Sequence, residues 1–429
     1  MRVSLTRLVD DTTVARIVHM VEEAQTKRAP SQAFVDKFAA VYTPVVLALA
    51  AGVVLVPPLL FAQAWEPWIY RGLSLLIVSC PCALVVSTPV SIVSAISNAA
   101  KRGVLIKGGI HLEQLGAIRA IAFDKTGTLT EGRPSVTDVV PLSGADETRL
   151  LQLAASLECG SQHPLAAAIV REAEARSIAL LPIHEMQPLS GLGVKAAVDG
   201  HEMAVGSPRM LADNTDFAHA DSAVKGLHRD GKTAVLVERD GVLIGVIGIA
   251  DAVRDTSRDA VAALKRMGIE HTIMLTGDNP AAAAAITTQA GIDEFRAELL
   301  PEAKLDAVTS LMGEYGQVAM VGDGVNDAPA LATATVGIAM GGAGTDTALE
   351  TADIALMADD LVQLPFAVGL SRAALRTIKI NIAFAIGIKM LALLLMFPGW
   401  LTLWMAIMAD MGASIIVTVN GIRLLKWRQ

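Results

Sequence analysis

Apolar positions along the chain follow two different patterns. Four stretches are almost continuously apolar and reach the roughly 20 residues that a helix needs to cross a bilayer. They are residues 41–62, 68–96, 378–397 and 401–425. Between the second and third stretches, short apolar runs alternate with polar, helix-like segments, as in a soluble α/β protein. The pattern therefore predicts two membrane hairpins on either side of a large soluble segment.

Aromatic and basic residues near these stretches predict their orientation. Trp65, Trp68, Trp400 and Trp404 border the spans, where aromatic side chains are enriched at membrane interfaces. Basic clusters follow the second span, precede the third and close the chain: Lys101, Arg102, Lys107, Arg372, Arg376, Lys379, Arg423, Lys426 and Arg428. With four spans, all these clusters fall on one side, and basic loops are typically cytoplasmic. We therefore expect an integral protein of a bacterial plasma membrane, with the large segment and both termini in the cytoplasm.

The soluble segment is predicted to contain a parallel sheet. Apolar runs at 120–123, 273–275 and 318–321 each end in a polar cluster, and helical patterns at 255–267 and 280–290 lie between them. Strands alternating with helices predict a doubly wound sheet, whose chemistry lies at the carboxyl ends of its strands. Residues 133–245 form an insertion after the first strand. The hairpin signal at Asp240-Gly241 predicts an α+β lobe with antiparallel strands there.

The bulk composition excludes several classes of protein. Hydrophobic residues make up 53% of the chain and the formal net charge is −8, so no broad basic surface is available to hold a nucleic acid. The three cysteines are too few for a disulfide scaffold. Any cysteine chemistry is therefore expected from the close pair Cys80 and Cys82, while Cys159 is interpreted as structural.

The most informative polar cluster is Asp124-Lys125-Thr126-Gly127-Thr128, which directly follows the first strand. A carboxylate at a strand end can attack a phosphoryl group whose charge is neutralised by its neighbours. Asp323 and Asp327 offer the oxygen ligands that Mg²⁺ prefers, and Thr276 and Lys304 are placed to hold a phosphoryl group. Taken singly, each Gly-Asp or Asp-Gly pair is more typical of a turn. Three such clusters after three successive strands favour a phosphoryl-transfer site.

A second set of polar residues lies inside the membrane spans. Cys80-Pro81-Cys82 interrupts the second span, and Lys389 and Asp410 lie deep in the last two. Proline breaks a helix and frees carbonyl groups, and thiolates favour soft metal ions. The alternatives are a kinked packing helix with buried cysteines and a structural Lys–Asp ion pair. Two thiolates, one carboxylate and one ammonium sum to neutrality with a divalent cation, whereas Cu⁺ leaves a net negative charge.

A third set lies in the inserted lobe. Glu158 and His163 can contact a nucleotide base, and Gly191 and Gly193 allow a ligand to approach bare backbone. Taken alone, a histidine before proline is more often a helix-start residue, and Gly-x-Gly is common. The residues by themselves leave both interpretations open.

The motifs together resemble those of the P-type ATPases: DKTGT at 124–128, TGD at 276–278 and GDGVNDAP at 322–329. The resemblance implies that ATP phosphorylates Asp124, with Mg²⁺ held by Asp124, the Thr126 carbonyl and Asp323. It also implies ATP binding by the third set of residues. Cys-Pro-Cys resembles the heavy-metal branch, and Lys389 with Asp410-x-Gly resembles its Zn²⁺/Cd²⁺/Pb²⁺ subgroup rather than its Cu⁺ subgroup. The implied catalytic residues are Asp124, Lys125, Thr126, Thr276, Gly277, Asp278 and Lys304, and the implied Mg²⁺ ligands include Asp327.

The predicted division of the chain follows from these assignments. It comprises a cytoplasmic segment at 1–40, membrane hairpins at 41–97 and 371–429, a phosphorylation domain at 98–132 and 246–370, and a nucleotide-binding domain at 133–245. The Thr-Gly-Glu motif of the family's actuator domain does not occur in the sequence. We therefore expect an N-terminally truncated pump that forms the aspartyl-phosphate but turns over poorly alone, unless a second polypeptide supplies the actuator and the remaining helices.

The predicted function is ATP-driven export of Zn²⁺, Cd²⁺ or Pb²⁺ through an aspartyl-phosphate. Two alternatives remain open from the sequence. One is a membrane-tethered phosphohydrolase, which Thr126 disfavours because such enzymes usually carry an acid/base aspartate two residues after the nucleophile. The other is an inactive remnant of a pump, which the intact polar clusters disfavour.

Overall fold

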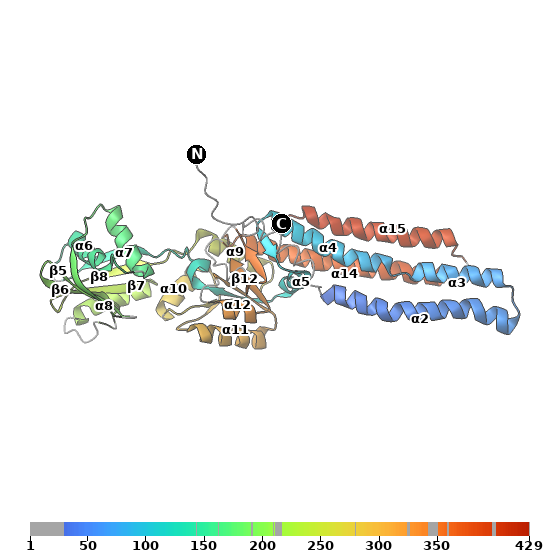
Figure 1. The fold of residues 1–429 in the computed structure, drawn as a ribbon, viewed down its shortest axis with the longest axis horizontal. Helices are drawn as coiled ribbons and strands as arrows, with labels where there is room; N and C mark the ends of the chain where they lie inside the picture. Colours follow the sequence, from blue (N-terminus) through green and yellow to red (C-terminus); the bar gives the residue numbers. More distant parts are fainter. Residues whose placement is uncertain are drawn as a thin grey trace, which may run out of the picture. The chain divides into compact units, whose positions relative to one another are not determined.

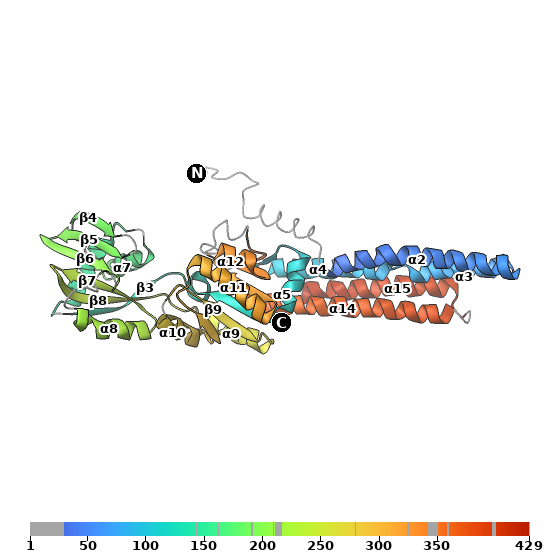
Figure 2. The same ribbon diagram turned by 90° about the horizontal axis from the view of Figure 1, so that it is seen from below.

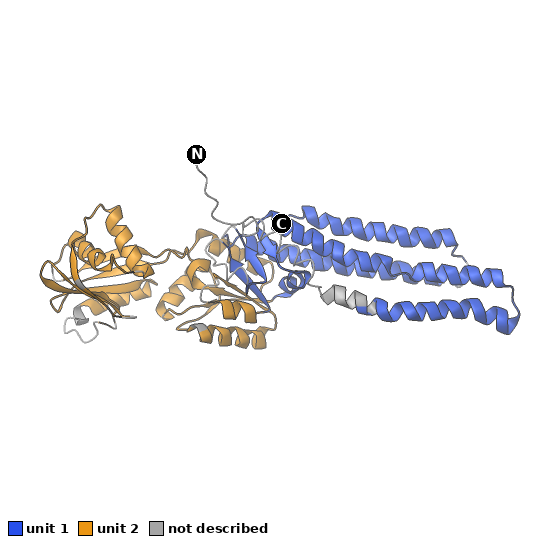
Figure 3. Ribbon diagram, viewed as in Figure 1, with its two compact units in different colours: residues 1–118, 335–342, 351–429 blue, residues 119–334, 343–350 orange. Residues whose placement is uncertain are grey.

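The computed structural model describes residues 30–428, apart from residues 143, 162, 190–191, 209, 211–216, 279, 324–326, 342–350, 358–359 and 397–399. Most of the predicted cytoplasmic segment at 1–40 therefore lies outside the described residues. The chain divides into two compact units (Figure 3). One comprises residues 1–118, 335–342 and 351–429, and the other comprises residues 119–334 and 343–350.

The first unit contains the membrane helices. These are α2 (Pro30–Phe61), α3 (Trp65–Ser79), α4 (Cys82–Lys101), α14 (Gln363–Met396) and α15 (Leu403–Ile422). In Figures 1 and 2, α3 and α4 follow one another end to end, and α2, α14 and α15 run alongside this pair. Within the described residues, 4 segments are long and apolar enough to cross a membrane, with α3 and α4 forming one of them. The four predicted membrane helices are confirmed. Helix α14 begins 15 residues before the predicted span because its first residues, although interspersed with basic ones, are buried in the unit.

Proline interrupts the second span. Helix α3 ends at Ser79 and α4 begins at Cys82, because Pro81 has no N–H to continue the ladder of hydrogen bonds. The chain re-enters the helix at once, since the amides of Leu84 and Val85 both donate to the Pro81 carbonyl. The break leaves carbonyl groups at the end of α3 free for side chains from neighbouring helices.

Three short strands complete the first unit. Strand β1 (Val104–Ile106) pairs antiparallel with β13 (Ile354–Leu356), which pairs parallel with β12 (Val336–Met340). Helix α5 (Gly109–Ala117) packs on the start of α14. Gly116 allows the two helices to approach closely, since it has no Cβ: a Cβ added there would lie 3.1 Å from the Ser371 backbone.

The second unit contains the predicted parallel sheet. Its strands are β11 (Val318–Gly322), β2 (Ala120–Asp124), β9 (His271–Leu275) and β10 (Glu294–Arg296), in that order and all parallel. The intervening helices are α9 (Asp255–Arg266), α10 (Pro280–Ala290), α11 (Pro301–Tyr315) and α12 (Ala328–Thr333). Apolar residues of β2, β9 and β11 pack with those of α11 and α12 in one buried cluster. Parallel strands buried in this way are continuous apolar runs, which is why the sequence revealed them.

The inserted lobe follows β2 and is α+β, as predicted. Its antiparallel sheet has the order β3-β8-β7-β6-β5-β4. The strands are β3 (Ser135–Pro141), β4 (Ile183–Leu189), β5 (Gly193–Val198), β6 (His201–Gly206), β7 (Thr233–Arg239) and β8 (Val242–Ala250). Strands β7 and β8 are joined at the predicted Asp240-Gly241 turn, where both residues have positive φ. The proposed domain boundary at residue 245 falls within β8.

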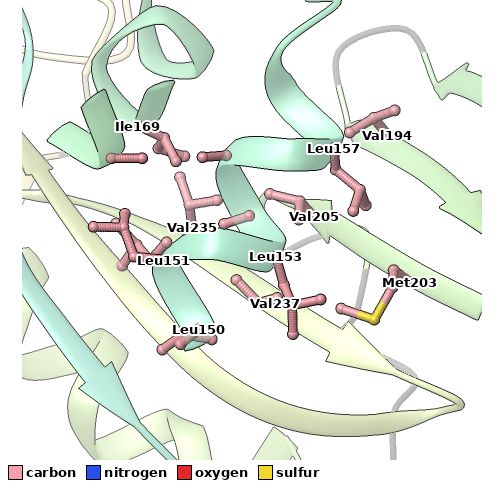
Figure 4. Close-up of a cluster of buried hydrophobic side chains, with 14 of the residues drawn as sticks. Leu150, Leu151, Leu153, Leu157, Ile169, Val194, Met203, Val205, Val235 and Val237 are labelled. Atoms are coloured by element: carbon pink, nitrogen blue, oxygen red, sulfur yellow. The ribbon is translucent and has the colours of Figure 1, made fainter. Parts of the chain in front are cut away.

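Alternation along these strands produces two cores. Helices α6 (Glu147–Glu158) and α7 (Pro164–Ala175) cover one face, where Leu151, Leu157 and Ile169 meet Val205 and Val235 (Figure 4). Helix α8 (Phe217–Arg229) covers the other face against a second set of strand residues. Successive strand residues point to opposite faces, so the sheet is apolar on both sides.

Candidate functional site

The predicted phosphoryl-transfer site begins at the end of β2. Asp124 is the last residue of this buried strand, and its side chain is only 7% exposed. Lys304, from the first turn of α11, donates from Nζ to Asp124 Oδ1 at 2.6 Å and to Asp327 Oδ1 at 2.7 Å. The structure thus brings together the predicted nucleophile, a cation and a second carboxylate from three separate parts of the sequence.

Burial and neighbouring charges shift the pKa values of Asp124 and Lys304. Burial and the neighbouring Asp327 carboxylate raise the pKa of Asp124 to about 7, while Lys304 opposes the rise. Burial acts to lower the pKa of Lys304, but its two carboxylate partners raise it above the ordinary value. Lys304 is therefore charged at neutral pH. It is the described positive group that favours ionised Asp124 most directly.

The loop after Asp124 turns sharply at Gly127, which has φ +73°. The Asp323 carboxylate lies beside this turn, since a Cβ at Gly127 would be 3.4 Å from Asp323 Oδ2. Two buried oxygens at the site, Thr128 Oγ1 and Asp327 Oδ2, have no hydrogen-bond partner among the described residues. Buried polar atoms without partners are costly, and carboxylate and hydroxyl oxygens suit Mg²⁺ and phosphate. The residues present therefore fit a Mg²⁺–phosphate ligand.

The predicted Thr276-Gly277-Asp278 cluster follows β9. Lys125 Nζ contacts Asp278 Oδ2 at 2.6 Å, which links the loops after β2 and β9. The Asp278 amide donates to Thr276 Oγ1 at 3.1 Å, and Thr276 is buried. Thr126 lies exposed at the site. Every predicted catalytic residue thus lies at the end of β2, in the loops that follow β2 and β9, or in the first turn of α11.

Two residues that support the site were not found from the sequence. Arg254 donates from Nε to the Thr130 carbonyl at 2.9 Å and from Nη2 to the Gly127 carbonyl at 3.0 Å. Asp251 accepts hydrogen bonds from Thr130 Oγ1 and from the Arg133 amide. Both lie where the chain leaves β8 and returns to the parallel sheet. The sequence signal that could have indicated Asp251 and Arg254 is their position at the end of the long insertion, where the chain returns to the parallel sheet.

Three of the residues predicted to bind a nucleotide line one cavity in the inserted lobe. The cavity has a volume of about 540 Å³ and its lining includes Glu158, His163 and Gly193. His163 is the N-cap of α7, with Nδ1 accepting from the Leu165 amide at 3.2 Å, so the helix-start interpretation is confirmed, while nucleotide binding by His163 stays a prediction. Burial raises the pKa of Glu158. The volume falls in the usual range for small-molecule sites, and Gly191 lies outside the described residues.

The cavity also contains a residue that the sequence did not indicate. Ser207 lines it, and its buried hydroxyl has no hydrogen-bond partner among the described residues. Gly193 has φ +154°, and a Cβ there would collide with the Val205 carbonyl. Apolar side chains, including Ile169 and Leu192, form much of the remaining lining. The combination of apolar walls with a few polar groups is typical of a small-molecule binding site.

The intramembrane residues also come together. One ligand atom each from Cys80, Cys82 and Asp410 lie within 4.8 Å of one another, close enough to hold one metal ion. Lys389 Nζ contacts Asp410 Oδ1 at 3.3 Å and also donates to the carbonyls of Val78 and Cys80. The ammonium therefore neutralises the carboxylate and caps the broken end of α3.

The structure differs from expectation at the two cysteines. The sulfur atoms of Cys80 and Cys82 are joined as a disulfide, whereas the metal site predicted from the sequence has two thiolates. The residues flank Pro81, which places their side chains on the same side of the helix break. Ligation of a metal ion through both sulfurs requires the reduced pair, because the thiolate is the ligand.

Comparison with known proteins agrees with this geometry. Residues 118–335 match the family model of the haloacid dehalogenase-like hydrolases. The chain is 54% identical over 430 residues to a cadmium-transporting ATPase of Staphylococcus aureus, covering 99% of this chain and 59% of that protein. It is 47% identical over 415 residues to the zinc/cadmium/lead-transporting P-type ATPase of Escherichia coli K12, covering 97% and 56%. The chain thus spans somewhat more than half the length of these relatives.

A solved structure matches as well. The crystal structure of a zinc-transporting PIB-type ATPase in its E2·Pi state superimposes with a TM-score of 0.80 at 45% identity, covering 98% of this chain and 68% of that one. The fold and the site define a haloacid dehalogenase-like phosphoryl-transfer unit joined to membrane helices. The chain belongs to the P-type ATPases, in their PIB-type branch.

Proposed function

We propose that this chain carries the phosphorylation and ion-binding machinery of a pump that exports soft divalent cations, Zn²⁺, Cd²⁺ or Pb²⁺, at the expense of ATP. One observation carries the proposal: the buried Asp124 carboxylate lies against Lys304, at the strand ends of a chain that also brings Cys80, Cys82 and Asp410 together in its membrane helices. A phosphoryl acceptor and an ion site in one chain are the two parts that a coupled pump requires.

In the proposed reaction, an Asp124 carboxylate oxygen attacks the γ-phosphorus of ATP. An O–P bond forms to Asp124, the bond to the β-phosphate oxygen breaks, and ADP leaves. Lys304 lies 2.6 Å from the nucleophile and can stabilise the charge on the transferred oxygens. Mg²⁺, held by Asp124, Asp323, Asp327 and the Thr126 carbonyl, supplies further positive charge when bound.

The inserted lobe is proposed to hold the nucleotide. The apolar part of its cavity suits the adenine ring, and Glu158 and His163 offer polar contacts at the rim. Gly193 shapes the cavity wall, because the absence of a side chain lets the start of β5 pack directly against the Val205 carbonyl of β6.

The ion site favours a divalent cation on charge grounds. Two thiolates and Asp410 carry three negative charges, which a divalent ion and Lys389 balance. The names of the relatives, which mention cadmium, zinc and lead, agree with this count. With positive loops inside, the phosphorylation and nucleotide-binding domains lie in the cytoplasm and transport is outward across a bacterial plasma membrane. The possibility that a second polypeptide supplies the actuator domain and the remaining helices stays a prediction. Purification of the protein from its natural membrane would show whether such a polypeptide is bound to it.

The test is cation uptake by inverted membrane vesicles containing the natural full-length polypeptide. We expect ATP-dependent accumulation of ¹⁰⁹Cd²⁺ that is lost in Asp124→Asn and in Asp410→Asn. ATP-dependent uptake of Cu⁺, without uptake of Cd²⁺ or Zn²⁺, would exclude the assignment of a divalent cation as the transported ion. ATP-dependent uptake that persists in Asp124→Asn would exclude the aspartyl-phosphate.

A further inference from the structure

Three helix ends meet where the membrane helices join the soluble segment. Helix α4 ends there at Lys101, α14 begins there at Gln363, and α15 continues into the short 3₁₀-helix η3 (Arg423–Lys426). In Figure 1 the ends of α4, α14 and α15 lie together, and η3 contacts both α4 and α14. Helix α4 also leads along the chain from the break at Pro81, through β1 and α5, to β2. Any movement of the membrane helices therefore passes through this junction before it reaches Asp124.

Asn98 joins α4 to η3. It lies in the last turn of α4 and is only 5% exposed. Its Nδ2 donates to the Leu424 carbonyl at 2.8 Å and to the Trp427 carbonyl at 3.0 Å. The last carbonyls of a helix have no amide partner further along that helix. A side chain of α4 thus binds carbonyls at the end of η3 and fixes the two helices to each other.

Two aromatic rings extend this contact to α14. Phe366, in the first turn of α14, is 4% exposed, and its ring centroid lies 5.6 Å from that of Trp427. The Arg102 guanidinium, directly after α4, lies 4.3 Å from the centroid of the Phe366 ring. Aromatic pairs at such separations and cation–π contacts are both attractive. We call Asn98, Arg102, Phe366, Leu424 and Trp427 the clasp, because together they join α4, α14 and η3.

The backbone around the clasp is closely packed. A Cβ at Gly421, near the end of α15, would lie 2.9 Å from Ser91 Oγ of α4. On the other side, Arg372 of α14 donates from Nη2 to the Ile118 carbonyl at 3.3 Å, just before β2 begins. The junction is therefore bonded directly to the chain that leads into the strand ending at Asp124.

The clasp joins the same three helices that contribute to the ion site. Cys82 is the first residue of α4, Lys389 belongs to α14 and Asp410 belongs to α15. An ion that draws these side chains together changes the relative positions of the three helices at that level. Coupling between distant sites is carried by rigid helices, packed side chains and hydrogen bonds. The clasp supplies such contacts at the other end of the same helices.

A buried network lies between the ion site and the clasp. Asn381 Nδ2 of α14 donates to Ser87 Oγ of α4 at 2.8 Å and to the Val417 carbonyl of α15 at 3.1 Å. Asn420 of α15 donates to Asn381 Oδ1 at 2.7 Å. The three helices are thus joined at the ion site, at this network and at the clasp, and the clasp is the level next to the soluble segment.

We propose that the clasp couples occupation of the ion site to phosphorylation of Asp124, with Asn98 and Trp427 as positioning residues. The proposal rests on the proposed function and adds to it the contact on which this coupling depends. With the clasp intact, α4, α14 and α15 shift together when the ion site fills, and the shift reaches β2. With the clasp loosened, the phosphorylation site no longer distinguishes a filled ion site from an empty one.

The test compares Trp427→Leu and Asn98→Leu with the control Trp404→Leu, which removes a tryptophan that is 77% exposed on α15. All are made in the natural full-length polypeptide, and the initial rate of phosphorylation by ATP and Mg²⁺ is measured with and without Cd²⁺. For both clasp variants we expect the ratio of the two rates to fall by roughly fivefold or more. The control should keep the ratio of the unmodified protein, and Trp427→Phe, which retains an aromatic ring, should keep most of it. Loss of folded protein alone lowers both rates in proportion and leaves the ratio unchanged.

A second measurement follows the clasp itself and does not depend on catalysis. The protein is labelled with 5-fluorotryptophan, and the ¹⁹F resonance of Trp427 is assigned from its loss in Trp427→Phe. Cd²⁺ should shift this resonance in the unmodified protein, because filling the ion site moves the helices that the clasp joins. The resonance should stay in place in Asp410→Asn, which lacks one ligand of the ion.

Two results would overturn the coupling role of the clasp. One is an equal ratio of rates in Trp427→Leu and in the unmodified protein, and the other is a Trp427 resonance that Cd²⁺ does not shift. In both cases Cd²⁺ still stimulates phosphorylation of the unmodified protein, so the proposed function stands. If Cd²⁺ does not stimulate phosphorylation of the unmodified protein, the proposed function fails and the coupling role fails with it.

Discussion

Replacing Lys304 with methionine tests how much the positive charge of this residue stabilises the two carboxylates of the predicted phosphorylation site. The lysine bridges Asp124 and Asp327, whose side chains are 7% and 1% exposed. Methionine keeps most of the apolar stem of the side chain and removes the ammonium group, with its charge and its two hydrogen bonds. The variant therefore leaves two carboxylates buried beside each other without their cation.

The magnitude follows from burial. Removing one partner of a buried ion pair costs about 3–5 kcal/mol of unfolding free energy, because the remaining charge has no compensation. Part of this cost is recovered when Asp124 takes up a proton. Its pKa is already raised to about 7, and without Lys304 burial and Asp327 raise it further. Between pH 7 and the new pKa, the variant loses stability at about 1.4 kcal/mol per pH unit relative to the unmodified protein. The deficit should therefore be larger at high pH.

Hydrogen exchange of the detergent-solubilised chain provides the assay. Peptides from β2 and β11 report the stability of the parallel sheet after correction for intrinsic exchange rates. We expect a deficit of about 3–5 kcal/mol at pH 8.5 that shrinks by roughly 1–2 kcal/mol at pH 6.5. The control is Lys265→Met, which breaks the ion pair with Asp293 on the same unit. Those side chains are 33% and 40% exposed, so its cost should stay below about 1 kcal/mol. Equal deficits for the two variants at both pH values would refute the reasoning.

Three further substitutions test other parts of the account. Arg254→Met removes two hydrogen bonds to carbonyls of the loop that follows Asp124. It should slow phosphoenzyme formation roughly tenfold, because this loop is no longer held in place. The ATP affinity, measured by displacement of a fluorescent nucleotide, should stay within about twofold. Gly193→Ala should weaken ATP binding by at least about tenfold, because its Cβ has no space, whereas Gly226→Ala in α8 meets no atom and should bind ATP normally. Asn381→Leu removes hydrogen bonds to Ser87 on α4 and to Val417 and Asn420 on α15. It should reduce the free energy of unfolding by about 1–3 kcal/mol, measured by thermal denaturation in detergent. Unchanged melting in the last variant would contradict the buried network.

Much of the fold could be predicted because its signals are local. Asp124 follows a run of buried apolar residues, and parallel strands bring their carboxyl ends to one edge, so the meeting of the loops at Asp124 and Asp327 follows from topology. The break at Pro81 is equally local, since the residue itself lacks the donor. The four membrane helices follow from length and hydropathy alone.

What the sequence did not reveal depends on contacts between distant residues. Arg254 reaches a carbonyl 127 positions away along the chain, and nothing in its neighbours indicates which loop it will hold. Lys389 was expected beside Asp410, but its bonds to backbone carbonyls of α3 depend on how closely the helices pack. A cavity of about 310 Å³ is lined by Glu66 and Tyr70 of α3 and by Leu401 of the α14–α15 connection, and no periodicity in the sequence specifies where these two segments meet.

The most direct test of the central claim is phosphorylation by [γ-³²P]ATP in the presence of Mg²⁺, with and without Cd²⁺ or Zn²⁺. The account predicts an acid-stable, hydroxylamine-labile phosphoenzyme that requires the divalent ion, maps to the peptide containing Asp124 and is absent in Asp124→Asn. Phosphate on any other residue, or equal labelling of Asp124→Asn, would contradict it.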